Sequence, residues 1–273
     1  MRENIEFIFS TDRDIVDVTI VMNIWKRNHI KEQLESLLSQ TVIPKEIWII
    51  HYEKHVYLSD IIEEYRMYFP HISVFDCDKN LRYFGRFSLA INITTKYAWL
   101  IDDDIIPGSE WLERCVIKCQ ELNSIISCTG RIIPENNYEP EKGGKGDSKK
   151  YFVGDIEYLF RNYCEKDTIV DFACNSYFFQ TKWLEAYWHI WPATFDTGED
   201  IHLSATCRNI LNVNTYVLKQ TNKQETGNLK KAYGFDDTAT WRYSNFLELR
   251  RNVLQYHILH KGWKPLEWRD KSY

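Results

Sequence analysis

The feature that most constrains this fold is the alternation of short apolar runs with amphipathic segments in the first half of the chain. Between the apolar runs, apolar residues recur at helical spacing, which indicates helices over 28–40, 58–69 and 108–122. The runs that indicate strands are 17–25, 45–52, 71–78, 97–102 and 124–133. Strands that alternate with helices of about 10–15 residues are typical of βαβ crossovers. We therefore predict an α/β fold, a three-layer α/β/α sandwich with a mainly parallel central sheet.

The character of the sequence changes after residue 133. Residues 134–150 are polar and glycine-rich, which predicts a mobile loop. The rest indicates strands over 169–179 and 213–220, helices over 181–191 and 198–210, and a long C-terminal helix over 238–262. Neither an internal repeat nor a linker is evident, so we predict one domain over 1–273, with halves of about 15–133 and 150–273.

Composition excludes several classes of protein. A net charge of -5 gives no sign of a basic nucleic-acid-binding surface, which argues against a nucleic-acid partner. The 7 cysteines are scattered without a CxxC pair, which argues against zinc and favours reduced thiols. The N-terminus lacks the pattern of a signal peptide, and no apolar run reaches the roughly 18 residues of a membrane span. We predict a cytoplasmic protein without a transmembrane segment, although a domain excised from a membrane-anchored parent would look the same.

Three consecutive aspartates, Asp102, Asp103 and Asp104, close the predicted strand 97–102. In open α/β sheets, ligands bind outside the carboxyl ends of the strands. Adjacent carboxylates raise each other's pKa unless a cation is near, and Mg²⁺ and Mn²⁺ prefer oxygen ligands. The triplet therefore predicts a site for a divalent cation and a diphosphate. On an extended chain Asp102 and Asp104 would point to one side and Asp103 to the other. The alternative is acidic charge that favours a following helix N-terminus.

Other catalytic patterns are missing from the sequence. It contains no GxGxxG, no GxxxxGK[ST] and no GxSxG, so a dinucleotide fingerprint, a P-loop and a nucleophile elbow are not supported. Carboxylates two residues apart at a strand end cannot easily flank a glycosidic bond, which argues against a glycosidase.

Several motifs together resemble a known family. The stretch TIVMNIWKRNHIKEQLESLLSQT, a second strand led by Pro-Lys-Glu, the DDD triplet and a later GED at 198–200 look like a family 2-like nucleotide-sugar glycosyltransferase of the GT-A fold. The resemblance covers roughly residues 17–220. NLRYFGRF, TTKYAWLIDDDI and TGEDIHLS are also similar to the C-terminal transferase domain of exostosin-type enzymes. The fold implied is the Rossmann-like GT-A sandwich, with a nucleotide-sugar half followed by an acceptor half.

The resemblance implies a role for each acidic residue. Asp104 matches the ligand of Mn²⁺ or Mg²⁺ that bridges the donor diphosphate, and Asp102 or Asp103 would contact the ribose or the metal. Asp200 matches the general base that deprotonates the acceptor hydroxyl in inverting members, and Glu199 would orient the acceptor or the base. This division suits the chemistry, since one group stabilises the leaving diphosphate and another accepts a proton. The alternative for Glu199 and Asp200 is N-terminal helix charge.

The resemblance also places residues at the donor. Arg86 and Arg82 resemble residues near the donor pocket, with surface charge as the alternative for Arg82. Family 2 enzymes usually end the second strand with an aspartate that pairs with uracil, whereas this chain reads WIIHYEKH. Glu53 is the candidate substitute, and His51 or Tyr52 could instead stack on the base.

Five more residues have two interpretations each. His202 is a metal ligand or an exposed helix histidine. Arg250 and Arg251 approach the diphosphate or carry helix surface charge. Trp188 and Trp191 form an acceptor sugar platform or pack in the core.

The prediction is a metal-dependent glycosyltransferase with Mn²⁺ or Mg²⁺ as cofactor. It would move a sugar from a nucleoside-diphosphate sugar, with UDP favoured, to a hydroxyl of a glycan or glycoconjugate acceptor, with inversion. One alternative is a retaining enzyme on the same fold. Another is a non-catalytic sugar- or nucleotide-binding module that kept the fold.

Overall fold

The computed structural model describes residues 12–133, 152–153 and 164–268, and the predicted loop 134–150 lies outside the described residues. The strands are β1 (Ile15–Ile24), β2 (Ile43–Tyr52), β3 (Ile72–Cys77), β4 (Tyr97–Ile101), β5 (Ile125–Ser127), β6 (Thr129–Arg131), β7 (Phe152–Val153), β8 (Thr168–Val170), β9 (Phe172–Cys174), β10 (Ser176–Gln180) and β11 (Thr215–Val217). The helices are α2 (Ile30–Leu38), α3 (Ser59–Arg66), α4 (Arg82–Ala90), α5 (Trp111–Leu122), α7 (Leu184–His189), α8 (Glu199–Leu211) and α9 (Phe246–Gln255).

An eight-stranded sheet in the order β3-β2-β1-β4-β10-β5-β11-β8 forms the centre of the fold. Strands β3, β2, β1 and β4 are parallel, as are β5 and β11, whereas β10 runs antiparallel to both of its neighbours. The mainly parallel sheet predicted from the sequence is confirmed. Because Met22 of β1 pairs with Ile101 of β4, both strands end at the same edge, and the residues that follow them meet there.

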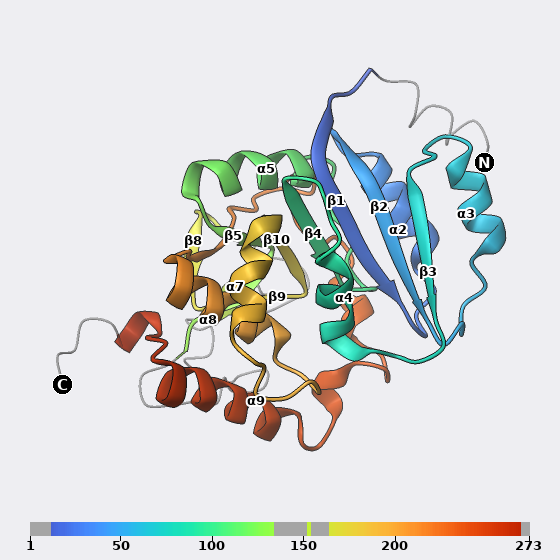
Figure 1. Cartoon of the computed structure of the whole chain (residues 1–273). Helices are drawn as coiled ribbons and strands as arrows, with labels where there is room; N and C mark the ends of the chain where they lie inside the picture. Colours follow the sequence, from blue (N-terminus) through green and yellow to red (C-terminus); the bar gives the residue numbers. More distant parts are fainter. Residues whose placement is uncertain (1–11, 134–151, 154–163, 269–273) are drawn as a thin grey trace.

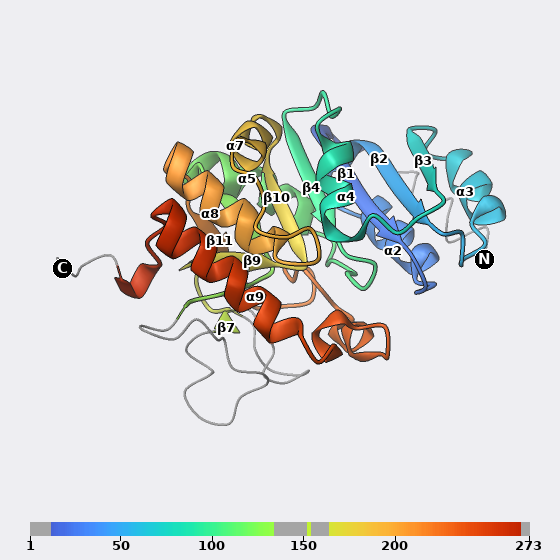
Figure 2. The ribbon, with the colours of Figure 1, turned by 60° about the horizontal axis from the view of Figure 1, so that its bottom comes forward.

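Helices cover both faces of the sheet. In Figures 1 and 2, α2 and α3 lie on one face of β1, β2 and β3, whereas α4 lies on the other face of the sheet beside β1 and β4, and α7 lies beside β10. Every residue of β4 is buried, which is typical of a central strand covered on both faces. No helix among the described residues combines the length and the apolar character that a membrane crossing requires.

Two predicted strands are each divided in the structure. The run 124–133 forms β5 and β6, and the run 169–179 forms β8, β9 and β10. Strand β6 pairs with β7 on one side and with β9 on the other in a separate three-stranded sheet. Asn175 has a φ of 63° between β9 and β10, a left-handed conformation that asparagine tolerates better than most residues. The hydroxyl of Ser127 donates to the carbonyl oxygen of Thr129 at 2.7 Å, where the chain passes from one sheet to the other.

The helices differ from the predictions in two places. Helix α4 was not predicted, because its sequence RYFGRFSLA has a glycine at its centre and no long helical repeat. The predicted helix 238–262 is wrong as one continuous element: the 3₁₀ turn η3 (Thr240–Arg242), helix α9 and the π turn η4 (Tyr256–His260) occupy that range.

The expectation that His202 is an exposed helix residue is also wrong. Its ring is buried between α8 and η4, where Nδ1 lies 3.0 Å from Nε2 of His257 and Nε2 lies 2.9 Å from the carbonyl oxygen of Tyr187. Burial lowers the pKa of His202 to about 4 and that of His257 to about 3, so both rings are neutral near pH 7. The pair joins α8 to the C-terminal region.

Candidate active site

The three aspartates follow β4 at the carboxyl edge of the sheet, where the sequence predicts them. The chain leaves the extended conformation at once: the N–H of Ile105 donates to the carbonyl oxygen of Asp102 at 3.2 Å, which closes a turn through Asp103 and Asp104. Strand alternation therefore ends at Ile101. The predicted pairing of Asp102 with Asp104 on one side is wrong, because Asp103 and Asp104 turn toward one arginine while Asp102 turns toward another.

The first of these arginines is Arg27, which lies in the loop after β1. Its Nη1 is 2.6 Å from Oδ1 of Asp103 and 3.1 Å from Oδ2 of Asp104. Its Nε and Nη2 donate to the two carboxylate oxygens of Asp236 at 2.7 and 2.9 Å. The side chain is only 11% exposed. Sequence reasoning missed both Arg27 and Asp236, although a basic residue directly after the first strand was a signal available in the sequence.

The second arginine is Arg86 on α4, whose side chain is 2% exposed. Its Nη1 donates to Oδ1 of Asp102 and, at 3.2 Å, to Oδ1 of Asn23. Its Nη2 donates to Oε1 of Glu199 at 3.1 Å. One guanidinium thus joins the aspartate triplet to the GED motif almost a hundred residues later in the chain, and the two motifs form one site.

Glu199 and Asp200 open α8. Gly198, with a φ of 82°, precedes them and lies against the side chain of Val253, where a Cβ would meet Val253 carbons at about 3 Å. Asp200 is buried and accepts from Arg250 of α9 through both oxygens, at 3.0 and 2.8 Å. The interpretation of Arg250 as helix surface charge is therefore wrong, since it is a buried partner of Asp200.

Burial shifts the protonation of the acidic residues. Burial and the charges of Asp102 and Asp103 raise the pKa of Asp104 to about 7. Burial and the neighbouring Asp200 raise the pKa of Glu199 to about 7, although Arg86 opposes this. Burial also raises the pKa of Asp103 against the opposing charge of Arg27. Carboxyl groups with raised pKa values at a strand edge are typical of functional sites.

The triplet has the donor atoms that a hard cation needs. Oδ1 of Asp104 is buried and accepts no hydrogen bond from the described residues. Among the described residues, no group of three or more histidine, cysteine, aspartate or glutamate side chains could hold a metal ion by itself. Mg²⁺ usually takes only one or two protein carboxylates together with substrate phosphates, so the triplet fits a cation that shares its ligands with a donor.

Glu53 lies further along the same edge, after β2. Its Oε2 accepts from Nε1 of Trp25 at 2.5 Å and lies 3.1 Å from Nε2 of His55. These contacts lower the pKa of Glu53. His51 and Tyr52 are buried, which makes their rings unsuited to stacking on a base.

The remaining predicted residues lie around this centre. Arg82 is 57% exposed and forms an ion pair with Asp196, in agreement with surface charge. Trp188 packs partly against the core, whereas Trp191 is 71% exposed. Arg251 is half-buried on α9.

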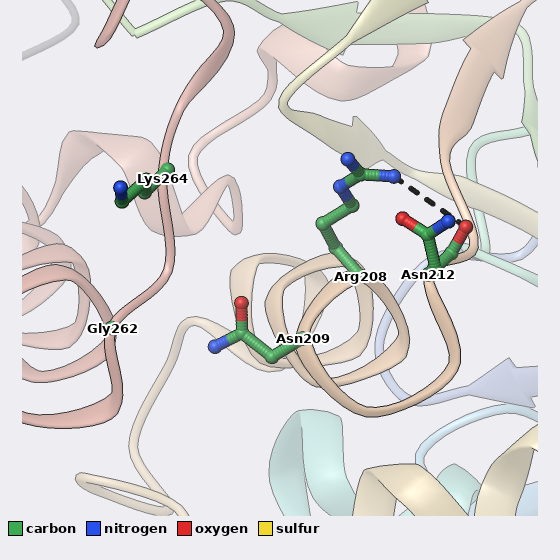
Figure 3. Close-up of a pocket in the computed structure, with 5 residues that line it drawn as sticks. All are labelled: Arg208, Asn209, Asn212, Gly262 and Lys264. Atoms are coloured by element: carbon green, nitrogen blue, oxygen red, sulfur yellow. Dashed lines mark hydrogen bonds between the residues drawn. The ribbon is translucent and has the colours of Figure 1, made fainter. Parts of the chain in front are cut away.

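A separate hollow lies at the other end of α8 from Glu199 (Figure 3). It is lined by Arg208, Asn209, Asn212, Gly262 and Lys264. None of the predicted site residues lines it, so it is distinct from the candidate active site.

Comparison with known proteins decides the family. The family model described as Glycosyl transferase family 2 matches residues 18–188, more than half of the chain. This chain belongs to glycosyl transferase family 2. It is a glycosyltransferase, and the matched residues include the aspartate triplet, Arg27 and Arg86, whereas Glu199 and Asp200 lie beyond them. No curated protein matches the sequence. The resemblance to exostosin-type transferase domains stays a prediction.

Three solved structures are similar to this chain. The crystal structure of residues 1–349 of S. aureus TarS is 16% identical with a TM-score of 0.50, over 75% of this family 2 chain and 58% of that chain. A second S. aureus TarS structure gives 16% identity and a TM-score of 0.49, over 75% of this chain and 35% of that one. The 1–349 fragment in complex with UDP gives 16% identity and 0.48, over 75% and 58%. The chain thus covers between 35% and 58% of the length of these structures, and the likeness to the first of them, with a TM-score of 0.50, shows the fold.

Proposed function

We propose that this family 2 glycosyltransferase is metal-dependent and moves a sugar from a UDP-sugar to a hydroxyl of a glycan acceptor with inversion. The observation that supports the proposal is the bridge from Asp102 through Arg86 to Glu199. Through Arg86, the aspartate triplet is connected to the carboxylates of the GED motif. The carboxylates of the triplet suit a metal and a diphosphate. Such a site has separate groups for the leaving diphosphate and for the acceptor proton.

Asp104 would hold Mn²⁺ or Mg²⁺ at the edge of the sheet, and Asp102, whose Oδ1 faces Arg86, would join it as a ligand through a change of side-chain orientation. The bound cation supplies positive charge that stabilises the diphosphate as it leaves the sugar. Oδ1 of Asp104 accepts no hydrogen bond from the part of the chain that the structure describes, which supports its assignment as a ligand. Asp103 and Arg27, which form an ion pair with each other, lie beside this proposed cation site.

Asp200 would accept the proton of the acceptor hydroxyl. Its Oδ1 accepts from Arg250 and from the N–H of Ile201, whereas its Oδ2 accepts only from Arg250 among the described residues. A carboxylate oxygen has two lone pairs, so Oδ2 can accept a further hydrogen bond. Arg250 would hold this oxygen in a fixed orientation, and Glu199 would orient the acceptor beside it.

The donor base would lie near Glu53. This carboxylate is at the carboxyl end of β2 beside Trp25, at the same edge as the triplet. A carboxylate there can accept a hydrogen bond from an N–H of a pyrimidine ring, which supports uracil as the base.

One observation favours a second candidate. Arg250 engages both oxygens of Asp200, so an acceptor hydroxyl would have to share this carboxylate with a guanidinium. A retaining enzyme on the same fold, which requires no side-chain base for the acceptor proton, is therefore the alternative mechanism.

Release of nucleoside diphosphate from a panel of UDP-, GDP- and dTDP-sugars in Mn²⁺ tests the proposal. We expect turnover of a UDP-sugar by transfer or slow hydrolysis, loss of turnover in EDTA, and a decrease of about 100-fold or more for Asp104→Asn, since the cation contributes several kcal/mol. Asp237→Asn is the control, because that side chain is fully exposed at 101%. Turnover that is unaffected by EDTA would remove Asp104 as a metal ligand, and absence of turnover with every donor would favour a binding module.

A further inference from the structure

A segment between β11 and α9 crosses the candidate donor site. We call residues 228–243 the strap. In Figure 1 it is the orange-red segment ahead of α9, below α4, and Figure 2 shows it between α9 and α2. The strap has no regular structure beyond two short 3₁₀ turns, η2 (Lys231–Phe235) and η3.

The start of the strap is fixed to the turn that follows the triplet. The N–H of Leu229 donates to the carbonyl oxygen of Ile106 at 2.6 Å, and the N–H of Ile106 donates to Oδ1 of Asn228 at 3.1 Å. Further along, Gly234 lies directly against Asp104, since a Cβ built on it would be 2.9 Å from Oδ2 of that residue. The strap therefore covers the carboxylate that is the proposed metal ligand.

The middle of the strap is held against α2 by contacts near the surface. The ring of Tyr233 stacks on His29 with centroids 3.9 Å apart, and its hydroxyl donates to Oε2 of Glu32 at 2.7 Å. Nζ of Lys230 is 3.3 Å from the other oxygen of Glu32, with both side chains more than a third exposed. Exposed ion pairs of this kind contribute little to stability. The middle of the strap is therefore held by contacts at the surface and not by a buried core.

The contact of Asp236 with Arg27 differs from these surface contacts. Asp236 engages Nε and Nη2, the edge of the guanidinium that binds a carboxylate or a phosphate with two parallel hydrogen bonds. The remaining Nη1 stays on Asp103 and Asp104, so this edge is fixed at the rim of the triplet. Asp236 is 38% exposed and comes from the strap, so it is the partner that can leave.

We propose that Arg27 binds the diphosphate of the donor, and that Asp236 occupies the same edge of its guanidinium until the donor displaces the strap. The inference rests on the proposed function, because the diphosphate is that of the nucleotide sugar. It assigns a donor-binding role to Arg27 and makes the strap an internal competitor of the donor. Loss of the competing carboxylate should then strengthen binding of the diphosphate, and loss of the guanidinium should weaken it.

Calorimetric titration with UDP in Mn²⁺ tests the proposal with a matched pair of variants. Asp236→Asn should bind UDP about 3- to 10-fold more tightly than the wild type, because it removes one part-exposed charged competitor. Asp237, the next residue of the strap, pairs with the exposed Arg242 and with no other cation among the described residues. Asp237→Asn should therefore bind UDP within about 2-fold of the wild type. Arg27→Gln should bind at least about 10-fold more weakly, since it loses a charged bidentate contact.

The double variant decides whether the two residues act together. In the Arg27→Gln background, Asp236→Asn should no longer tighten binding of UDP. Arg27→Lys, which keeps the charge without the planar edge, should bind with intermediate affinity and serves if Arg27→Gln does not fold. Melting temperatures identify any variant that is unfolded.

Two outcomes overturn the proposal in different ways. Equal or weaker binding by Asp236→Asn, or tightening that persists without Arg27, overturns the competition and leaves the proposed function standing. No binding of UDP, GDP, dTDP or inorganic pyrophosphate by any of the proteins overturns the proposed function together with it.

Discussion

Arg86→Ala is expected to lower the melting temperature of the protein by roughly 6–20 °C, which corresponds to about 3–5 kcal/mol of stability. Arg86 is buried and contacts Asp102 and Glu199, which are its partners on two different elements. Removal of the guanidinium leaves the buried Glu199 and the part-buried Asp102 without that partner, and an unpaired buried charge is strongly destabilising. The loss exceeds that expected for a surface ion pair by several fold.

Arg82 provides the matched control for this experiment. It lies one helical turn before Arg86 on α4, but it is 57% exposed and pairs with Asp196 at the surface. Arg82→Ala should change the stability by less than about 1 kcal/mol. Thermal denaturation of both variants is the measurement. If the two substitutions had equal effects, the assignment of Arg86 as the link between the two motifs would be wrong.

Asp200→Asn is expected to lower the rate of sugar transfer by about 100- to 10,000-fold if Asp200 is the general base. Asparagine keeps the shape and the hydrogen-bonding oxygen of the side chain but cannot accept a proton at neutral pH. The affinity for UDP should stay within about 3-fold of the wild type, because the residue is assigned to the acceptor side of the site.

The control for Asp200 must separate chemistry from folding, since the substitution leaves Arg250 without its anionic partner. Melting temperature and UDP affinity are therefore measured on the same preparation as the transfer rate. Transfer by Asp200→Asn at the rate of the wild type would remove this residue as the base and favour the retaining alternative.

Much of the fold could be predicted because its first half obeys local rules. Apolar runs such as 17–25 and 45–52 are long enough to show the strand period, and both strands formed with bounds that differ by two residues or fewer. Helix α4 could not be predicted, since its stability depends on burial of Phe84, Arg86 and Phe87 against other elements and not on a local pattern. The continuous helix 238–262 was wrong for a related reason: its first residues lie in the strap, where contacts with distant residues decide the conformation.

In the candidate site, too, local sequence patterns predicted some features, whereas others depend on contacts between distant segments. The position of Asp102 to Asp104 at a strand end followed from hydrophobic periodicity. Their side-chain directions did not, because a turn replaces strand alternation directly after Ile101. Arg27 and Asp236 are more than two hundred residues apart, and no spacing rule in the sequence connects them. Charge pairs between distant segments depend on tertiary structure alone, and they were the part of the site that the sequence could not reveal.

The most direct test of the central claim is the rate at which the protein releases UDP from UDP-sugars in the presence and absence of a divalent cation. The account predicts release in Mn²⁺ or Mg²⁺, restoration of activity when the cation is added back after EDTA, and little release by Asp104→Asn under either condition. Equal release by wild type and Asp104→Asn, with and without EDTA, would contradict the assignment of the aspartate triplet as the site of the cation and the diphosphate.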